Sequence, residues 1–311
     1  MSKQLVWLVT GTSSGIGREI VLAALDRGDH VIATTRGRSF DALAALKEKG
    51  AAILELDVTA PMEKLDAIAA EAVKIYGRVD VLVNNAGDRS YEAPQDLRPE
   101  DTLQQFNTNL FGPLNVTRAF LPYMRERRTG TVAWIGSVGG YSFIPLCGLY
   151  CATKAAMIRV SEALNVELQP FNVRSICFDF GWFNTELAHP DRLAPLTQRI
   201  PDYKQKAEDW NSLTRSAHFH YVSHGSRLTR ASLLPEYYQN LPGDPVKAGK
   251  LLVQVIRGEG VASGKAVPSR FAVGADAYGV IKDDAVTSAE RLEAWRDVSA
   301  STDVEKAAVA I

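Results

Sequence analysis

Short apolar runs alternate with longer segments of helical period through the first two thirds of the chain. The runs are nearly continuous in Val, Ile, Leu and Ala, as expected for strands that are covered on both faces. In segments such as 16–27 and 62–76, apolar residues recur every three or four positions. The predicted strands are residues 5–10, 30–35, 52–56, 79–83, 131–135 and 173–178. Strand alternating with helix predicts an α/β fold with a doubly wound, mostly parallel sheet flanked by helices on both faces.

Glycine and proline agree with this alternation. Gly28 and Gly50 stand where helices are expected to end, and Pro61 and Pro99 where helices are expected to begin. A further helix is predicted before Pro170, because apolar residues recur there at four-residue intervals. These apolar residues are Ala156, Val160, Leu164 and Leu168.

The alternation fails after about Thr185. Residues 186–243 contain five prolines and many aromatic side chains, and we interpret them as an elaborated substrate loop or lid over the functional edge of the sheet. A helix at about 244–257 and a last strand at about 270–273 follow. We interpret residues 282–311 as a C-terminal extension, helical from about Ser288, that frays or packs on a partner. The chain is therefore predicted to form a single domain over residues 1–311.

Composition narrows the possible partners. Of the 311 residues 46% are hydrophobic and the net charge is −1, which gives no electrostatic reason to expect nucleic acid or an anionic membrane surface. The apolar run at 5–9 is too short for a signal-peptide core, and no stretch approaches the roughly 18 apolar residues of a membrane span. Cys147, Cys151 and Cys177 have no metal-ligand spacing and are interpreted as packing residues. We expect a cytoplasmic protein that acts on a small molecule.

Tyr150 and Lys154 are the strongest candidates for chemistry. Four residues is just over one helical turn, so both side chains project from the same face of the predicted helix. A phenol beside an ammonium ionises more easily, because the positive charge favours the phenolate. Ser137 could supply a hydroxyl to the same reacting oxygen. Tyr-x-x-x-Lys alone is also typical of a solvated helix face, but with Ser137 it predicts proton transfer to or from a carbonyl or alcohol.

A glycine-rich segment joins the first predicted strand directly to the first helix. It reads Thr10-Gly11-Thr12-Ser13-Ser14-Gly15-Ile16-Gly17. Glycine permits the tight turn and lets backbone N–H groups approach a pyrophosphate at the helix N-terminus. The segment predicts a dinucleotide site, and the candidate binding residues are Gly11, Ser13, Ser14, Gly15, Ile16 and Gly17.

The end of the second strand indicates which dinucleotide binds. An acidic residue there would accept a hydrogen bond from the ribose 2′-hydroxyl and repel a 2′-phosphate. The chain instead has Arg36 and Arg38 after Thr35, with no carboxylate. Because arginine pairs with phosphate through two parallel hydrogen bonds, NADP(H) is favoured over NAD(H) as the cofactor. The alternative is that Arg36 stacks on adenine while Arg38 faces solvent.

The order of these motifs resembles the short-chain dehydrogenase/reductase family. The glycine segment, Asn84-Asn85-Ala86-Gly87, Ser137, Tyr150 and Lys154 follow one another as in that family, and the likeness covers roughly residues 5–185. Residues 268–277 look like the family's last strand. The resemblance implies a Rossmann-type domain in which Tyr150 is the general acid/base, Lys154 promotes its ionisation and binds the nicotinamide ribose, and Ser137 bonds the substrate oxygen. It also implies a homodimer or homotetramer built through the helices after strands four and five.

The same resemblance assigns further residues. Asn109 matches an asparagine that holds a water in a proton relay; Asn107 is its near competitor, and the other reading of Asn109 is a structural bond to a neighbouring strand. The cofactor-binding residues implied are Asp57 and Val58 at the adenine, Asn84, Asn85, Ala86 and Gly87 under the adenosine ribose, Tyr150 and Lys154, and Gly181, Phe183 and Thr185 at the nicotinamide. Asn84 could instead serve the sheet alone. Phe180 stands where the family has proline, and the loss of a fixed φ is expected to loosen this turn.

These features together predict an NADP(H)-dependent oxidoreductase that interconverts a ketone or aldehyde and an alcohol. The aromatic content of Trp182, Phe183 and residues 186–243 favours a hydrophobic substrate, in line with hydroxysteroid-dehydrogenase-like members that carry an extended substrate loop. Tyr91, Tyr141 and Phe143 are further candidates to contact it. Two alternatives stay open: a non-catalytic nucleotide-sensing or scaffold protein on the same fold, and a cofactor-retaining isomerase or lyase.

Three histidines form a separate motif. His218, His220 and His224 have a spacing that can bind zinc, but no cysteine or acidic ligand stands nearby. We interpret them as part of a polar or substrate-facing loop and predict no metal site.

Overall fold

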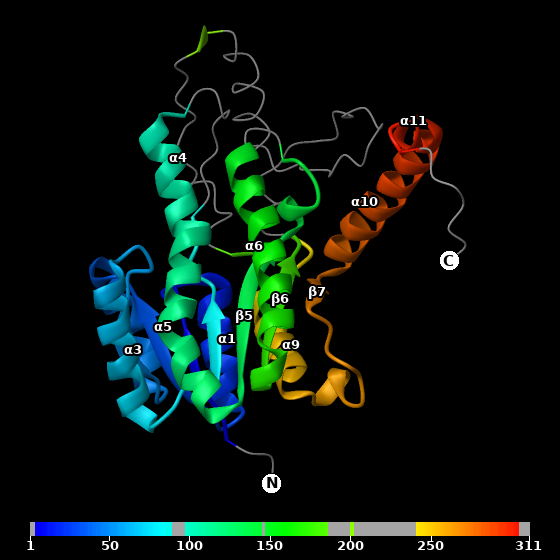
Figure 1. Cartoon of the computed structure of the whole chain (residues 1–311). Helices are drawn as coiled ribbons and strands as arrows, with labels where there is room; N and C mark the ends of the chain where they lie inside the picture. Colours follow the sequence, from blue (N-terminus) through cyan, green and yellow to red (C-terminus); the bar gives the residue numbers. More distant parts are fainter. Residues whose placement is uncertain (1–3, 89–96, 145–146, 186–199, 202–240, 305–311) are drawn as a thin grey trace.

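The computed structural model describes residues 4–88, 97–144, 147–185, 200–201 and 241–304, and Figure 1 shows the path of the chain. Within these residues the centre is a seven-stranded sheet of order β3-β2-β1-β4-β5-β6-β7, in which all neighbours are parallel. The strands are β1 (Val6–Val9), β2 (His30–Thr35), β3 (Ala52–Glu55), β4 (Val81–Asn84), β5 (Gly130–Ser137), β6 (Val173–Phe180) and β7 (Arg270–Val273). The predicted α/β, doubly wound Rossmann fold is confirmed.

Helices cover both faces of this sheet. Figure 1 shows α3, α5 and α6 on one side, while α1 and α9 pack on the other. The α-helices are α1 (Gly15–Asp26), α2 (Ala44–Glu48), α3 (Met62–Tyr76), α4 (Pro99–Phe106), α5 (Gly112–Arg127), α6 (Gly148–Glu167), α9 (Pro245–Arg257), α10 (Ala275–Ala294) and α11 (Arg296–Ala300). Shorter turns are the 3₁₀ segments η1 (Gly37–Leu43), η3 (Val138–Gly140), η4 (Gln169–Phe171) and η8 (Gly260–Ala262), and the π-helical η2 (Asn107–Phe111).

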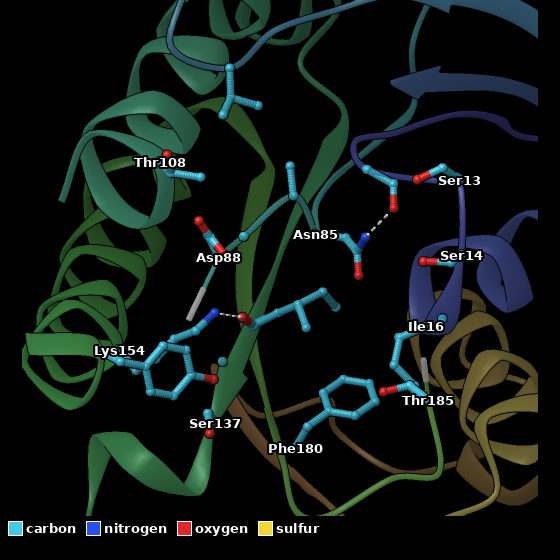
Figure 2. Close-up of a pocket in the computed structure, with 18 of the residues that line it drawn as sticks. Ser13, Ser14, Ile16, Asn85, Asp88, Thr108, Ser137, Lys154, Phe180 and Thr185 are labelled. Atoms are coloured by element: carbon cyan, nitrogen blue, oxygen red, sulfur yellow. Dashed lines mark hydrogen bonds between the residues drawn. The ribbon is translucent and has the colours of Figure 1, made fainter. Parts of the chain in front are cut away.

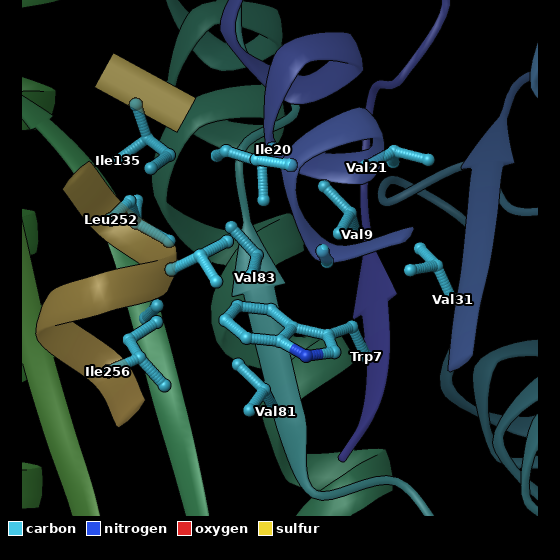
Figure 3. Packing of buried hydrophobic residues seen from close by; sticks show 14 of the residues in the cluster. Trp7, Val9, Ile20, Val21, Val31, Val81, Val83, Ile135, Leu252 and Ile256 are labelled. Carbon is cyan, nitrogen blue, oxygen red and sulfur yellow. The ribbon is translucent and has the colours of Figure 1, made fainter. Parts of the chain in front are cut away.

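The strands are almost continuously apolar because both of their faces are buried. In β1, Trp7 packs with Ile20 of α1 and Leu252 of α9 (Figure 3), whereas its neighbours Val6 and Leu8 join the core under α3, α5 and α6. Successive side chains of a strand point to opposite faces, so a strand between two helical layers needs apolar residues at every position.

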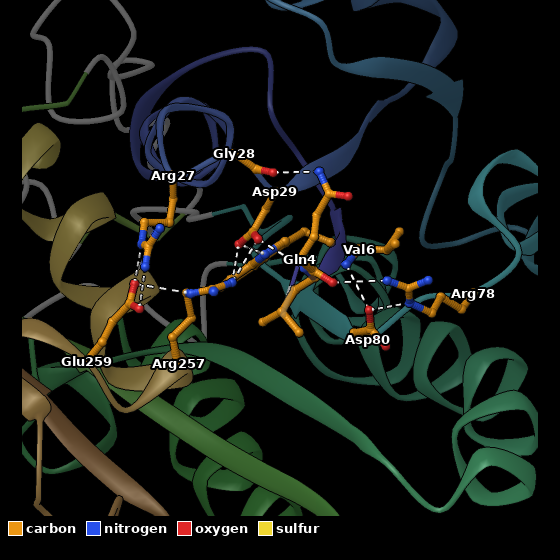
Figure 4. Close-up of polar contacts among 11 residues, drawn as sticks. Gln4, Val6, Arg27, Gly28, Asp29, Arg78, Asp80, Arg257 and Glu259 are labelled. Carbon is orange, nitrogen blue, oxygen red and sulfur yellow. Dashed lines mark hydrogen bonds and ion pairs between the residues drawn. The ribbon is translucent and has the colours of Figure 1, made fainter. Parts of the chain in front are cut away.

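Buried carboxylates hold the amino ends of the central strands. Asp29 accepts hydrogen bonds from Trp7 Nε1 at 2.9 Å and from Arg257 Nη1 at 2.7 Å (Figure 4), and Asp80 accepts the Val6 N–H at 2.9 Å. The Asp29–Arg257 pair ties α9 to the start of β1 and β2. Burial raises the pKa of Asp80, but hydrogen bonds from two arginines and from Val6 outweigh it and lower the pKa below its ordinary value.

Several boundaries differ from the sequence prediction, and three of them concern the strand ends at the candidate site and the last long helix. Strands β5 and β6 run to Ser137 and Phe180, two residues beyond the predicted ends, so the ladder itself carries candidate site residues. Helix α10 begins at Ala275 and runs unbroken through Ser288, the predicted helix start. The reason is tertiary, because Ala277 in its first turn is buried against Val138 of η3. Residues 186–199, 202–240 and 305–311 of the predicted loop and extension lie outside the described part of the chain.

Candidate active site

A cavity of about 410 Å³ lies at the carboxyl ends of the strands, where the strand order reverses between β1 and β4 (Figure 2). Parallel strands bring the loops that follow them to one edge of a sheet, so motifs far apart in sequence meet there. Most of the predicted site residues line this cavity. They are Gly11, Ser13, Ser14, Gly15, Ile16, Arg36, Asp57, Val58, Asn85, Ala86, Gly87, Ser137, Tyr150, Lys154, Gly181, Phe183 and Thr185.

The glycine segment forms one wall, at the N-terminus of α1. Gly11 has φ +69°, and a Cβ there would lie 2.8 Å from the Ala86 Cα, so only glycine fits between the two loops. Gly15 has φ +59° and faces Thr185 across the cavity. The first N–H groups of α1 have no partner within their own helix. This geometry suits a phosphate group.

Asn85 joins the glycine segment to the end of β4. Its Nδ2 donates to the Thr10 and Gly11 carbonyl oxygens at 2.8 and 2.9 Å. Figure 2 shows Asn85 beside the cavity. A Cβ on Gly17 would lie 2.3 Å from that same Nδ2, so glycine at this position leaves room for the Asn85 side chain. Gly17 does not line the cavity. Asn84 also points away, since its Nδ2 donates to Thr117 Oγ1 at 2.9 Å. The structure therefore separates Asn84 and Gly17 from the other predicted residues.

Arg36 and Asp57 lie together where an adenosine would reach. Burial raises the pKa of Asp57, but hydrogen bonds from the Thr59 N–H and hydroxyl, with the charges of Arg36 and Lys64, lower it below its ordinary value. The guanidinium of Arg36 is thus near an ionised carboxylate and open to the cavity, together with the hydroxyl of Ser39. Nothing is described of the Arg38 side chain.

Ser137, Tyr150 and Lys154 meet at the other end of the cavity. Ser137 ends β5, while Tyr150 and Lys154 lie in the first two turns of α6. Lys154 Nζ is 5.7 Å from the centroid of the Tyr150 ring and donates to the Ile135 carbonyl at 2.7 Å. Lys154 as a whole residue is 6% exposed, so its side chain is largely shielded from solvent. The predicted arrangement of a hydroxyl, a phenol and an ammonium exists in the fold (Figure 2).

Asn109 is fully buried beside this end and does not line the cavity. Its Oδ1 accepts the Asp88 N–H at 2.7 Å, and its Nδ2 donates to the Asp88 carbonyl at 2.7 Å and to Thr153 Oγ1 at 3.3 Å. The residue lies in the π-helical η2, a rare conformation that is frequent at functional sites. Its carboxamide joins the loop after β4 to α6, so the bonds printed for its side chain go to a loop and a helix and not to a neighbouring strand; its part in a proton relay stays a prediction.

The turn after β6 closes the cavity. Phe180, in the place of the family's proline, is 6% exposed and packs edge-on against Phe183 with ring centroids 5.2 Å apart. Thr185 approaches the glycine segment, with its Cβ 3.6 Å from where a Gly15 Cβ would stand. The turn after β6 therefore contacts the hydrophobic core through Phe180 and approaches the glycine segment through Thr185.

Two predicted substrate contacts are not at the cavity. The Tyr141 hydroxyl donates to Asp179 Oδ2 at 2.6 Å, and Phe143 is 67% exposed outside the lining. Asp179 is fully buried behind the β5 end, and burial raises its pKa to about 6 against the hydrogen bonds of Tyr141 and Cys177. Tyr91 lies outside the described residues.

Several lining residues were not assigned from sequence. Ser39 follows Arg36 by three positions, and hydroxyls near an arginine are a usable signal for a phosphate site. Ile144 packs beside Trp182 in an apolar wall, and its place there depends on how two loops fold, for which the sequence holds no local signal. The unassigned lining residues are Thr35, Ser39, Leu56, Thr59, Asp88, Thr108, Ile135, Gly136, Val138, Ile144 and Phe180.

The described ranges contain no group of three His, Cys, Asp or Glu side chains that could hold a metal ion, and the three histidines of residues 218–224 fall outside those ranges. No helix within the described ranges has the length and apolar character needed to cross a bilayer.

Comparison with known proteins agrees with this geometry. A 3-ketodihydrosphingosine reductase of Bacteroides thetaiotaomicron is 34% identical over 203 residues, 65% of this chain and 72% of the relative. Among solved structures, a short-chain dehydrogenase from Streptomyces avermitilis has a TM-score of 0.77 and 33% identity, covering 98% of this chain and 100% of its own. A variant of actinorhodin polyketide ketoreductase with NADPH has a TM-score of 0.65 and 28% identity, covering 88% and 98%.

Residues 5–195 match the family model described as short chain dehydrogenase. That match spans more than half of the chain, and the seven-stranded parallel sheet carries the motifs at the edge where they are expected. The chain belongs to the short-chain dehydrogenase/reductase family, whose members are oxidoreductases of CH–OH and C=O groups.

Proposed function

We propose that this protein is an NADP(H)-dependent reductase or dehydrogenase that interconverts a hydrophobic ketone or aldehyde and the corresponding alcohol. One observation carries the proposal: Ser137, Tyr150 and Lys154 meet at one end of a cavity whose opposite wall is a glycine segment at a helix N-terminus. A dinucleotide that binds along this cavity has its pyrophosphate at the glycines and its reactive ring beside the three side chains.

The residues present fit such a cofactor. The glycine segment would hold the pyrophosphate, since a Cβ at Gly11 would block the approach between the two loops. Arg36 and Ser39 would hold a 2′-phosphate, which favours NADP(H), and the ketoreductase neighbour was solved with NADPH. When bound, the nicotinamide supplies or accepts the hydride.

The protein's own part is to hold and move the proton. Ser137 Oγ accepts the Gly139 N–H at 3.1 Å, so its own O–H is left to donate to a substrate oxygen. Tyr150 gives its proton to that oxygen during reduction, and Lys154 lies beside the ring that loses the proton, with its Nζ 5.7 Å from the ring centroid. Both donors act where negative charge develops on the carbonyl oxygen, which lowers the barrier to hydride transfer.

The wall at this end favours an apolar substrate. Ile144 packs with Cys147, Cys151 and Trp182 beside Tyr150. The names of two similar proteins, a 3-ketodihydrosphingosine reductase and a polyketide ketoreductase, point to substrates with a ketone on a long carbon skeleton. A hydrophobic ketone is therefore proposed rather than a sugar.

An oligomer built through the helices that follow β4 and β5, which are α4, α5 and α6, is part of the same proposal. Leu103 and Phe111, at this surface, are 58% and 45% exposed, which a partner subunit would cover. Light scattering on purified protein at several concentrations tests the assembly; a monomer at all of them would reject it.

Substitution of Tyr150 tests the function. Tyr150→Phe keeps the ring and removes the proton, so kcat with NADPH and a panel of hydrophobic ketones should fall by roughly 10²–10⁴-fold while the Kd for NADPH changes little. Tyr278→Phe, at a residue 63% exposed on α10, is the matched control and should keep full activity.

Other outcomes of the same assay separate the competing functions. Near-normal turnover by Tyr150→Phe would reject the proton-transfer role. NADPH binding by the wild type without turnover of any carbonyl compound would favour the nucleotide-sensing protein. Product formed without net cofactor consumption would favour an isomerase or lyase.

A further inference from the structure

The turn after β6 keeps its place without the proline that the family uses. The ring of Phe180 lies in the core against Phe183 and does not restrict the φ of the backbone as a proline ring does. Yet Gly181, Trp182 and Phe183 line the cavity at the end where Tyr150 and Ser137 stand. Something other than a proline ring must fix this backbone.

Hydrogen bonds from the segment after β7 do so. The Trp182 N–H donates to Asp276 Oδ2 at 2.6 Å, although the two residues are 94 positions apart. The preceding N–H, of Gly181, donates to the Val273 carbonyl at 3.0 Å. Two successive N–H groups of the turn are therefore bound by β7 and the first turn of α10. A carboxylate acceptor makes a shorter and stronger bond than a neutral one.

Two glycines make room for this carboxylate. A Cβ on Gly181 would lie 2.2 Å from Asp276 Oδ2, and a Cβ on Gly274 would lie 2.4 Å from Asp276 Oδ1. Gly274 also has φ +108°, which other residues rarely adopt. Both glycines thus serve one purpose, the close approach of the Asp276 side chain.

The other side of the turn is anchored as well. The Gly243 N–H donates to the Trp182 carbonyl at 3.0 Å, so the peptide groups on both sides of the Trp182 Cα are held. Thr185, three residues on, stands over Gly15 of the phosphate wall. A shift of the turn would therefore move Thr185 and Phe183 relative to the glycine segment.

We propose that Asp276 is a positioning residue for the cofactor: it sets the turn of residues 181–183 against the nicotinamide end of the cavity and replaces the constraint of the missing proline. Asp276 acts through the Trp182 N–H and does not touch the reacting atoms. This inference rests on the proposed NADP(H) site.

Binding measurements with two ligands test it. Asp276→Ala should raise the Kd for NADPH about tenfold or more, the scale of one hydrogen bond to a charged group. The Kd for 2′,5′-ADP, which reaches only the adenosine end, should stay at the wild-type value. A folded Asp276→Ala protein that binds both ligands equally weakly would overturn the positioning role.

Two further variants test whether the effect comes from the hydrogen bond between Asp276 and Trp182. Asp276→Asn should recover most of the NADPH affinity, because its amide oxygen can accept the same N–H. Gly181→Ala, which displaces the carboxylate, should reproduce the Asp276→Ala pattern and decides the matter if Asp276→Ala does not fold. Asp283→Ala, at an exposed aspartate of the same helix, is the control.

The outcomes distinguish this inference from the proposed function. Wild-type NADPH affinity in Asp276→Ala, or no recovery in Asp276→Asn, overturns the role of Asp276 alone. Failure of the wild-type protein to bind NADPH overturns the proposed cofactor, whatever Asp276 does.

Discussion

Asp179 is the charged side chain buried most completely near the site, and the conformation of its neighbours depends on it. It is fully buried, and a Cβ on Gly136 would lie 2.2 Å from its Oδ1, so the strand end that carries Ser137 packs directly on this carboxyl group. Tyr141 and Cys177 donate to it, and Arg270 and Lys154 are the nearby cations. Ionisation of a carboxyl group this deeply buried lowers the stability of the folded state, because a charge is poorly solvated there.

This enclosure predicts how stability changes with pH. Because burial raises the pKa of Asp179 from 3.8 to about 6, the folded protein binds a proton more tightly there than the unfolded chain does. Its contribution is fully present below about pH 4 and is lost as the pH rises to about 6, a change of about 3 kcal/mol. Relative to Asp179→Asn, which cannot ionise, the wild type should lose unfolding free energy over this range.

Urea unfolding of both proteins between pH 4 and 7 measures the difference. The other titrating groups are common to the two proteins and cancel in the comparison. Parallel curves for wild type and Asp179→Asn would show that the carboxyl group is not perturbed as described.

At the scale of elements, helix α9 packs so closely on α1 that one added methyl group would clash with the α1 backbone. Gly249 of α9 is buried, and a Cβ there would lie 2.6 Å from the Glu19 carbonyl oxygen and 3.0 Å from the Ile20 nitrogen. These are backbone atoms of α1, which cannot move without the helix. Gly249 is the point of closest approach that lets Leu252 and Ile256 reach the core (Figure 3).

Two glycine-to-alanine variants should therefore change stability in opposite directions. Gly249→Ala should lower the unfolding free energy by about 1–3 kcal/mol, because overpacking outweighs the better helix propensity of alanine. Gly279→Ala in α10 meets no atom of the described chain within 4 Å and should raise it by about 0.5–1 kcal/mol. Chemical denaturation measures both. A stabilised Gly249→Ala would show that α1 and α9 are less tightly packed.

At the scale of the whole molecule, the two halves of the sheet meet at the cavity, so a ligand there should stabilise the complete fold. NADPH at 100 times its Kd should add about 2.7 kcal/mol. For a chain of 311 residues that is a rise in Tm of roughly 3–5 °C. NADH at the same concentration should give a smaller rise, because it lacks the phosphate that Arg36 would bind.

Arg36→Ala connects this global effect to one residue. The variant should lose most of the difference between NADPH and NADH in Tm, measured by differential scanning fluorimetry. Arg296→Ala, at an exposed arginine paired with Glu293, should keep the difference. An equal response of the wild type to both cofactors would contradict the assignment of NADP(H).

Local features of the sequence anticipated most of the fold and the chemistry. Strand and helix periods depend on neighbours one to four positions away, so the sheet, α6 and the Tyr150–Lys154 pair could be predicted from the chain alone. The glycine segment could be predicted as well, because its conformation depends on glycine itself.

Tertiary packing decided the side-chain directions and the long-range contacts, which no local sequence pattern contains. Asn84 and Asn85 are adjacent, yet one side chain bonds Thr117 of α5 and the other the glycine segment, since alternate strand residues point to opposite faces. The early start of α10 and the bond from Trp182 to Asp276 depend on β7 lying beside β6. The sequence by itself determined the elements and the candidate reactive residues. The sheet order, which unites residues nearly a hundred positions apart, decided which side chains face the cavity and which contacts hold its walls.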